Sequence, residues 1–290
     1  MIFNQVKTAV LLATLAGLLM MMGNYFGGTQ GLIIFALISL VINGYAYYFS
    51  DTMVLRMYNA QPLDKAQFAW IYKSVEELAH KEGMPMPKLW YVPLGIANAF
   101  ATGRDKNHAS VAVTQGILDT LDKNELRGVL AHELSHVKNR DILISTIAAT
   151  LATAVGFIAY MARNMALFGM SGQDGRRTNP LALLLIAIFM PLAASLIQLA
   201  ISRSREYLAD ESGAELSHDP LALAAALEKL ERKAKEDSRT GRVEVNPTTA
   251  HMFIVKPFLG GGLQALFSTH PPMEKRVARL RAMYEKMMGV

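Results

Sequence analysis

Two histidines and a glutamate within five residues have the types and spacing of a metal centre. The segment Leu126–Arg140 contains His-Glu-Leu-Ser-His at positions 132–136. On a helix, side chains four residues apart project from one face, so His132 and His136 can bind one metal ion, with Glu133 beside them as a base. The alternative is an amphipathic helix with two partly solvated histidines. The glutamate directly after the first histidine favours the metal interpretation.

A catalytic zinc ion normally has three protein ligands and a water molecule, so this centre needs a third ligand. The chain contains no cysteine, and the ligand must therefore be nitrogen or oxygen. No spacing singles out one of the remaining histidines, which are His80, His108, His218, His251 and His270.

An acidic pair further along the chain is a better source of the third ligand. Glu206 and Asp210 lie four residues apart, on one face if the segment is helical. If the apolar runs before them leave and re-enter a membrane on one side, this segment returns beside His136. Glu206 can then bind the metal while Asp210 orients a liganding imidazole. The alternatives are a surface acidic patch paired with Arg203 and Arg205, or a third ligand from Glu211 or Glu215.

With one Zn²⁺ per chain on His132, His136 and Glu206, the expected chemistry is hydrolysis. Zinc lowers the pKa of its water toward about 7 and polarises a carbonyl group. Glu133 accepts the proton of that water and delivers it to the leaving amine. The sequence therefore predicts peptide-bond cleavage without a covalent intermediate.

The composition indicates a membrane protein. Of the 290 residues, 52% are hydrophobic and only 18% are charged, against about 25% charged in an average soluble domain. The net charge of +5 suits anionic lipid head groups. Because no basic run has interleaved aromatic residues, we do not expect nucleic acid as a partner.

Two apolar runs near the N-terminus, residues 8–22 and 31–49, predict a transmembrane hairpin. A cleaved signal peptide is the alternative, but the first run lacks an obvious cleavage site and a second run follows at once. The linker Gly27–Gln30 has no Lys or Arg, whereas Lys7 precedes the hairpin and Arg56 follows it. By the positive-inside bias, the linker faces outward and the catalytic segments are cytoplasmic.

Residues 142–161 and 181–201 form a second apolar pair, and Pro191 predicts a kink in the latter. Spanning would place the arginines of the intervening loop outside, against the charge bias. A re-entrant pair, a pair shielded by protein, and burial in a soluble core are the alternatives.

The remaining segments predict a mixed catalytic part. Asp122 or Asn124 is the expected N-cap of the metal-binding helix. Period-2 and helical patterns predict strands at 88–93, 98–102 and 110–114, and helices at 63–82, 220–236 and 272–288, with a partly β-like stretch at 243–267. The basic last helix has a solvated face or contacts lipid head groups.

The predicted fold class is therefore mainly α, with an α+β catalytic part and about four transmembrane helices. The expected domains are an N-terminal transmembrane hairpin at 1–50, the first catalytic part at 51–140, a second transmembrane or re-entrant hairpin at 141–201, and the second catalytic part at 202–290.

Five motifs, together with the four apolar runs, resemble the HtpX membrane zinc metalloproteases, relatives of the larger CAAX prenyl proteases. The motifs are Asn98-Ala-Phe-Ala-Thr-Gly103, the 132–136 motif, Ser202-Arg-Ser-Arg-Glu-Tyr-Leu-Ala-Asp210, Asn246-Pro-Thr-Thr-Ala-His251 and Ser268-Thr-His-Pro-Pro272. The likeness covers nearly the whole chain.

The resemblance implies a zincin-like domain on the cytoplasmic side of the cell inner membrane, with Glu206 as third ligand. It implies quality control of misfolded membrane proteins in a stress response, so protein substrates and the lipid bilayer are the expected partners. A substrate peptide would lie along an edge strand, with Asn98 and Phe100 as contacts. His270 and Arg276 would sit over the metal and hold substrate or the developing oxyanion, although His270 before two prolines also suits a rigid turn.

Two rival functions are a protease that trims prenylated protein tails and a non-catalytic scaffold or metal carrier that binds zinc. The larger relatives that trim tails have more spans than the four counted here, which disfavours the first. Glu133 disfavours the second, because metal storage needs no base. The sequence carries no signal for oligomeric state or for substrate sequence preference.

Overall fold

A computed structural model describes the parts of the chain that carry the predicted site. The described residues are 20, 23–24, 27–38, 40–41, 48–49, 51–52, 54–139, 141, 203–240, 253–255 and 271–289. The chain splits into two compact units, Met1–Ala46 with Ile147–Ala200, and Tyr47–Thr146 with Ile201–Val290. All the strands and the labelled helices α2 to α9 belong to the second unit.

The first unit is described mainly by residues 27–38, which are helical. The predicted linker Gly27–Gln30 is assigned as helical, but Gly28 has a positive φ of +58° and the backbones of Gly23 and Gly31 lie in close contact, so the chain reverses direction here as the predicted hairpin requires. No helix within the described ranges is both long and apolar enough to cross a membrane. Most of run 8–22 and all of runs 142–161 and 181–201 lie outside those ranges.

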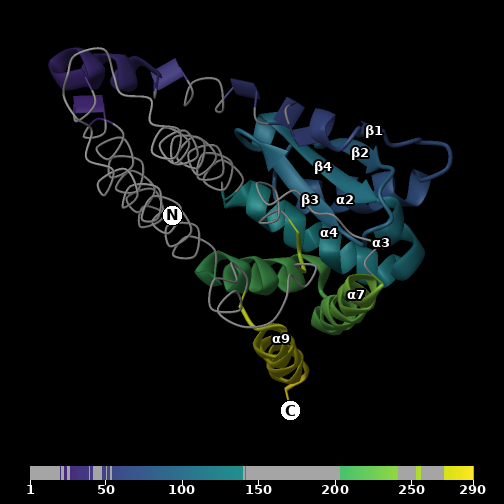
Figure 1. Ribbon diagram of the computed structural model, residues 1–290. Coiled ribbons are helices and arrows are strands. Elements are labelled where there is room, and N and C mark those ends of the chain that lie inside the picture. The colour runs from purple at the N-terminus through teal and green to yellow at the C-terminus, as the bar shows by residue number, and fades with distance from the viewer. Residues whose placement is uncertain are drawn as a thin grey trace. The chain divides into compact units, whose positions relative to one another are not determined.

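A four-stranded mixed sheet forms the frame of the second unit (Figure 1). Its strands are β1 (Gln61–Pro62), β2 (Lys88–Val92), β3 (Ala99–Gly103) and β4 (Ala109–Thr114), in the order β1-β2-β4-β3. β2 and β4 are parallel, and the other two pairs are antiparallel. The three predicted strands are confirmed, the two-residue β1 is additional, and β3 is an edge strand.

Alternate residues of the strands pack on opposite faces of the sheet, as period-2 geometry requires. Leu89, Val111 and Val113 join the main core with helices α2 (Ala69–Lys81), α4 (Lys123–Lys138) and α7 (Pro220–Arg239). Phe100 and Ala112 point the other way, into a smaller cluster with Val54, Leu55 and Val92.

Helix α2 (Ala69–Lys81) begins later than the predicted start at Leu63. The Leu63 backbone N–H donates to the carbonyl of Leu89, which extends the sheet. The Asp64 side chain then accepts hydrogen bonds from the N–H groups of Ala66 and Gln67 and so closes a turn. These local bonds keep the residues before Ala69 out of the helix.

Helix α4 (Lys123–Lys138) carries the two histidines, and the predicted metal-binding helix is confirmed as a helix. Asp122 is its N-cap, and with Glu125 it forms a capping box. Glu125 is buried and also pairs with Lys229 of α7 at 2.6 Å. The start of α4 is therefore fixed both locally and against α7.

Three further helical segments complete the second unit: residues 203–217, α7 (Pro220–Arg239) and α9 (Met273–Met288). Figure 1 shows α7 and α9 close together below α4. The last two helices match the predicted ones to within a few residues, and the short α3 (Gln115–Thr120), capped by Thr114, was not predicted. Of the predicted β-like stretch at 243–267, only residues 253–255 are described, and they form no strand.

Candidate metal centre

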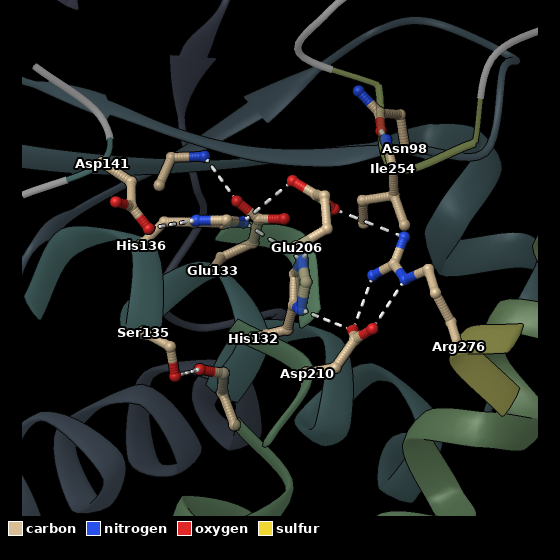
Figure 2. Close-up of polar contacts among 12 residues, drawn as sticks. Asn98, His132, Glu133, Ser135, His136, Asp141, Glu206, Asp210, Ile254 and Arg276 are labelled. Carbon is tan, nitrogen blue, oxygen red and sulfur yellow. Dashed lines mark hydrogen bonds and ion pairs between the residues drawn. The ribbon is translucent and has the colours of Figure 1, made fainter. Parts of the chain in front are cut away.

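The structure brings His132, His136 and Glu206 together from α4 and from the 203–217 helix (Figure 2). The two imidazole Nε2 atoms are 3.2 Å apart. Oxygens of Glu206 lie 3.7 Å from Nε2 of His132 and 3.5 Å from Nε2 of His136. His132 and Glu206 are buried and His136 is partly buried, so these donors converge in a largely dry site.

The spacing of these donors fits one tetrahedral divalent ion. With bonds of about 2.0–2.2 Å, two ligands of a tetrahedral ion lie about 3.3–3.6 Å apart. The three measured separations of 3.2, 3.5 and 3.7 Å fall around that range. Among the described residues, these three are the one set of His, Asp and Glu side chains that could hold a metal ion.

Each of the two imidazoles has a buried carboxylate on its Nδ1 side (Figure 2). Asp210 Oδ1 lies 3.1 Å from Nδ1 of His132, the arrangement expected of Asp210 from the sequence. Asp141 Oδ2 lies 3.1 Å from Nδ1 of His136. A carboxylate there favours the tautomer that leaves Nε2 free to bind a metal. Sequence reasoning missed Asp141, whose one signal was an acidic residue directly before the apolar run.

Arg276 of α9 is fully buried, at 0% exposure, and binds Asp210 with two short bonds. Its Nε and Nη2 donate to Asp210 Oδ2 and Oδ1 at 2.7 and 2.6 Å. Its Nη1 lies 3.4 Å from Glu206 Oε2. The guanidinium therefore faces the carboxylates of Asp210 and Glu206, and the substrate or oxyanion role that the resemblance implies for Arg276 stays a prediction.

Burial and neighbouring charges shift the protonation of this cluster. Burial alone lowers the pKa of His136, but the hydrogen bond with Asp141 and the charge of Glu206 outweigh it and raise that pKa to about 9. Burial raises the pKa of Glu133, and the nearby His132 and His136 partly offset this. A raised pKa suits Glu133 to a role in which its carboxyl group first accepts a proton and then returns it.

Glu133 is held by the edge strand. The backbone N–H of Ala101, in β3, donates to Glu133 Oε2 at 2.9 Å. Because this N–H points to Glu133, it points away from β4, the strand with which β3 pairs. The carboxylate is thus fixed between the metal donors and the outer edge of β3.

The other predicted site residues lie around this centre in different settings. Asn98 is buried, and its Oδ1 accepts a hydrogen bond from the N–H of Ile254. Phe100 is buried on the opposite face of the sheet, 5.7 Å from the ring of Tyr58. Glu211 and Glu215, the alternative ligands, are exposed and line a cleft beside α9. His251 and His270 lie outside the described residues.

Gly213 lets the helix that carries Glu206 approach the helix that carries His132. A Cβ atom built on Gly213 would lie 2.8 Å from both the Cα and the backbone N of His132. Backbone atoms in a packed helix cannot move aside as a flexible side chain can. Only glycine therefore allows this spacing, and the sequence offered no sign of it.

Replacing Gly213 with alanine should reduce the free energy of unfolding by about 1–3 kcal/mol, because overpacking forces the two helices apart. A urea titration of each variant would measure this. Gly95→Ala is the matched control, since a methyl group there meets nothing within 4 Å. Equal stability of the two variants would mean that the close approach is not required.

Comparisons with known proteins agree with this geometry. The model of peptidase family M48 matches residues 65–284. A Protease HtpX homolog of Sulfurihydrogenibium sp. is 50% identical over 290 residues, covering 98% of this chain and 97% of that protein. A Protease HtpX homolog of Methylibium petroleiphilum is 52% identical over 281 residues, covering 97% of this chain and 98% of that protein.

A solved structure shares the fold. The crystal structure of S. mikatae Ste24p matches with a TM-score of 0.54 at 20% sequence identity. The match covers 96% of this chain and 66% of the Ste24p chain. At this identity the likeness concerns the arrangement of elements alone.

Proposed function

This chain belongs to peptidase family M48, together with the HtpX proteases, and on that premise we propose that it is a zinc-dependent endopeptidase of the membrane. Membership confirms the family that the sequence motifs indicated and makes the chain a metalloprotease. The metal identity, the role of each site residue and the substrates are the proposed part.

Zinc is the metal that this donor set suits best. Two imidazole nitrogens and one carboxylate are a ligand set of catalytic zinc sites, which leaves a fourth position open. His132, His136 and Glu206 would hold the ion, and their mutual distances support this role. When bound, zinc would polarise the scissile carbonyl and lower the pKa of its water ligand toward about 7.

Glu133 moves the proton in the proposed reaction. Its carboxylate accepts a proton from the attacking water and passes that proton to the nitrogen of the leaving amine, so that the peptide bond breaks without a covalent enzyme intermediate. The hydrogen bond from Ala101 holds Oε2, so Oε1 is the oxygen that would accept the proton of the water. Asp210 and Arg276 keep the imidazole of His132 oriented.

The outer edge of β3 is the proposed place for the substrate. An extended peptide can add to the edge of a sheet through backbone hydrogen bonds. β3 is the edge strand next to Glu133, and the bond from Ala101 places the base beside that edge. The side chains of Asn98 and Phe100 are buried, and the backbone N–H and carbonyl of Asn98 bond to Thr114. The outward backbone groups that would bind the peptide are therefore those of Ala99 and the carbonyl of Ala101, while Asn98 and Phe100 would support the strand.

Membrane proteins are the proposed substrates, cleaved on the cytoplasmic side as part of quality control. The apolar runs, the hydrophobic content of 52% and the distribution of Lys and Arg around the first hairpin support this location. A peptidase anchored in the bilayer encounters misfolded membrane proteins directly.

The single observation that carries the proposal is the convergence of three metal donors beside a buried glutamate that is tied to an edge strand. The test is metal analysis and casein cleavage with the full chain purified in detergent. We expect about one zinc per chain and cleavage that a chelator abolishes. Stoichiometric zinc without any cleavage would favour the scaffold function instead.

Replacing Glu206 with alanine should remove most of the bound zinc, because two imidazoles alone do not complete a zinc site. Equilibrium dialysis followed by elemental analysis would measure the loss. Glu211→Ala is the control, since Glu211 is an exposed carboxylate on the same helix. If the Glu211 variant lost zinc and the Glu206 variant kept it, the assigned ligand would be wrong.

A further inference from the structure

The mechanism above gives no role to a buried carboxylate beside His136, that of Asp141, which is 1% exposed. We propose that Asp141 is a positioning residue, which fixes the tautomer and direction of His136. This inference rests on the proposed metal centre and extends it to a residue outside the ligand set.

The geometry at His136 carries the first half of the inference. Asp141 Oδ2 lies 3.1 Å from Nδ1, while Nε2 of the same ring faces His132 and Glu206. A proton held on Nδ1 by the carboxylate leaves the lone pair of Nε2 for a metal. Helix α4 ends at Lys138, so Asp141 reaches the ring from beyond the last turn of the helix.

The burial of Asp141 supplies the second half. A buried carboxylate is costly unless it is paired. Oδ1 of Asp141 receives no hydrogen bond from the described residues, whereas Oδ2 lies against Nδ1 of His136. The contact with His136 therefore helps to compensate the burial of this carboxylate.

The arrangement repeats what the structure has at His132. There Asp210 lies 3.1 Å from Nδ1, and Arg276 binds Asp210 through two hydrogen bonds. Each imidazole thus has a buried aspartate on its Nδ1 side.

The buried charges around the centre balance when a divalent ion is counted with them. Four buried carboxylates contribute four negative charges, and two buried guanidinium groups contribute two positive charges: Glu133, Asp141, Glu206, Asp210, Arg205 and Arg276. A divalent ion between neutral imidazoles supplies the remaining two. Removing the charge of Asp141 therefore changes both the direction of His136 and the attraction for the metal.

The test uses the full chain in detergent, with zinc affinity measured by competition against a chelating dye. We expect Asp141→Ala to weaken zinc binding by about 100-fold and Asp141→Asn by about 10-fold, the range typical of residues that orient a ligand. Glu82→Gln is the matched control, because Glu82 pairs with Lys138 at the same end of α4. Its affinity should stay at the wild-type value.

The absorption spectrum of bound Co²⁺ separates positioning from simple loss of stability. At saturating Co²⁺, Asp141→Asn should shift the visible bands, since the His136 ligand is turned, whereas a merely destabilised protein would keep the wild-type spectrum. If the Asp141→Ala variant does not fold, Asp141→Asn decides the question. Wild-type affinity and spectrum in Asp141→Asn would overturn the inference for Asp141.

A wild-type chain that binds no zinc would refute the metal centre itself, which is a separate result from the failure of the inference for Asp141.

Discussion

Replacing Glu133 with glutamine should leave zinc bound and lower kcat for casein cleavage by about 100- to 10,000-fold. A positioned general base contributes about 10²–10⁴-fold to such a reaction. Glutamine keeps the shape of the side chain and can still contact the N–H of Ala101 through its amide oxygen. It cannot accept a proton from water, so the loss should fall on the chemical step.

The measurement combines elemental analysis with steady-state kinetics on the same preparation. Glu77→Gln is the control, because Glu77 is an exposed carboxylate that pairs with Arg127 of α4 and lies outside the site. Its kinetics should match those of the wild type. Turnover by the Glu133 variant at the wild-type rate would remove this residue from the mechanism, and loss of zinc from it would indicate an unexpected structural role.

Replacing Arg276 with glutamine should lower the free energy of unfolding by about 3–5 kcal/mol, the usual effect of breaking a buried ion pair. Asp210 would lose both of its short hydrogen bonds from the guanidinium and remain buried with an uncompensated charge. At present, burial tends to raise the pKa of Asp210, and the charge of Arg276 outweighs it and holds that pKa below its ordinary value. Urea titration of the metal-free protein would measure the effect without any contribution from zinc.

Arg281→Gln provides the matched control on the same helix. Arg281 pairs with Glu228 at the surface and is 59% exposed, so its loss should cost at most about 1 kcal/mol. The comparison also distinguishes two roles for Arg276. A residue that holds substrate would raise KM while stability stayed unchanged, whereas a residue that positions Asp210 lowers stability even without substrate.

Local sequence patterns predicted most of the secondary structure that the structure describes. The three longer strands, the helix of the histidines and the last two helices follow from periodicity and from caps such as Asp122. The error at the start of α2 arose from a non-local contact. The start of α2 depends on a backbone bond between Leu63 and Leu89, which lies far along the chain and which no periodicity signals.

The candidate site was predictable where its geometry depends on one helix. His132, Glu133 and His136 share a helix, so their spacing alone sets which side chains converge. Glu206 and Asp210 came from the same kind of spacing together with an assumed return of the chain. The structure brings both beside the histidines, and their roles as ligand and orienting group are tested by the variants above.

The sequence by itself therefore determined the class of chemistry and the helix that carries it, because residue types and helical spacing are local properties. Only the tertiary structure decided that Asp141 lies behind His136, that Arg276 is buried on Asp210, and that Gly213 sets the distance between two helices. These features depend on contacts between backbones and charges far apart along the chain. Such contacts arise from packing and charge compensation in three dimensions, which no short stretch of sequence encodes.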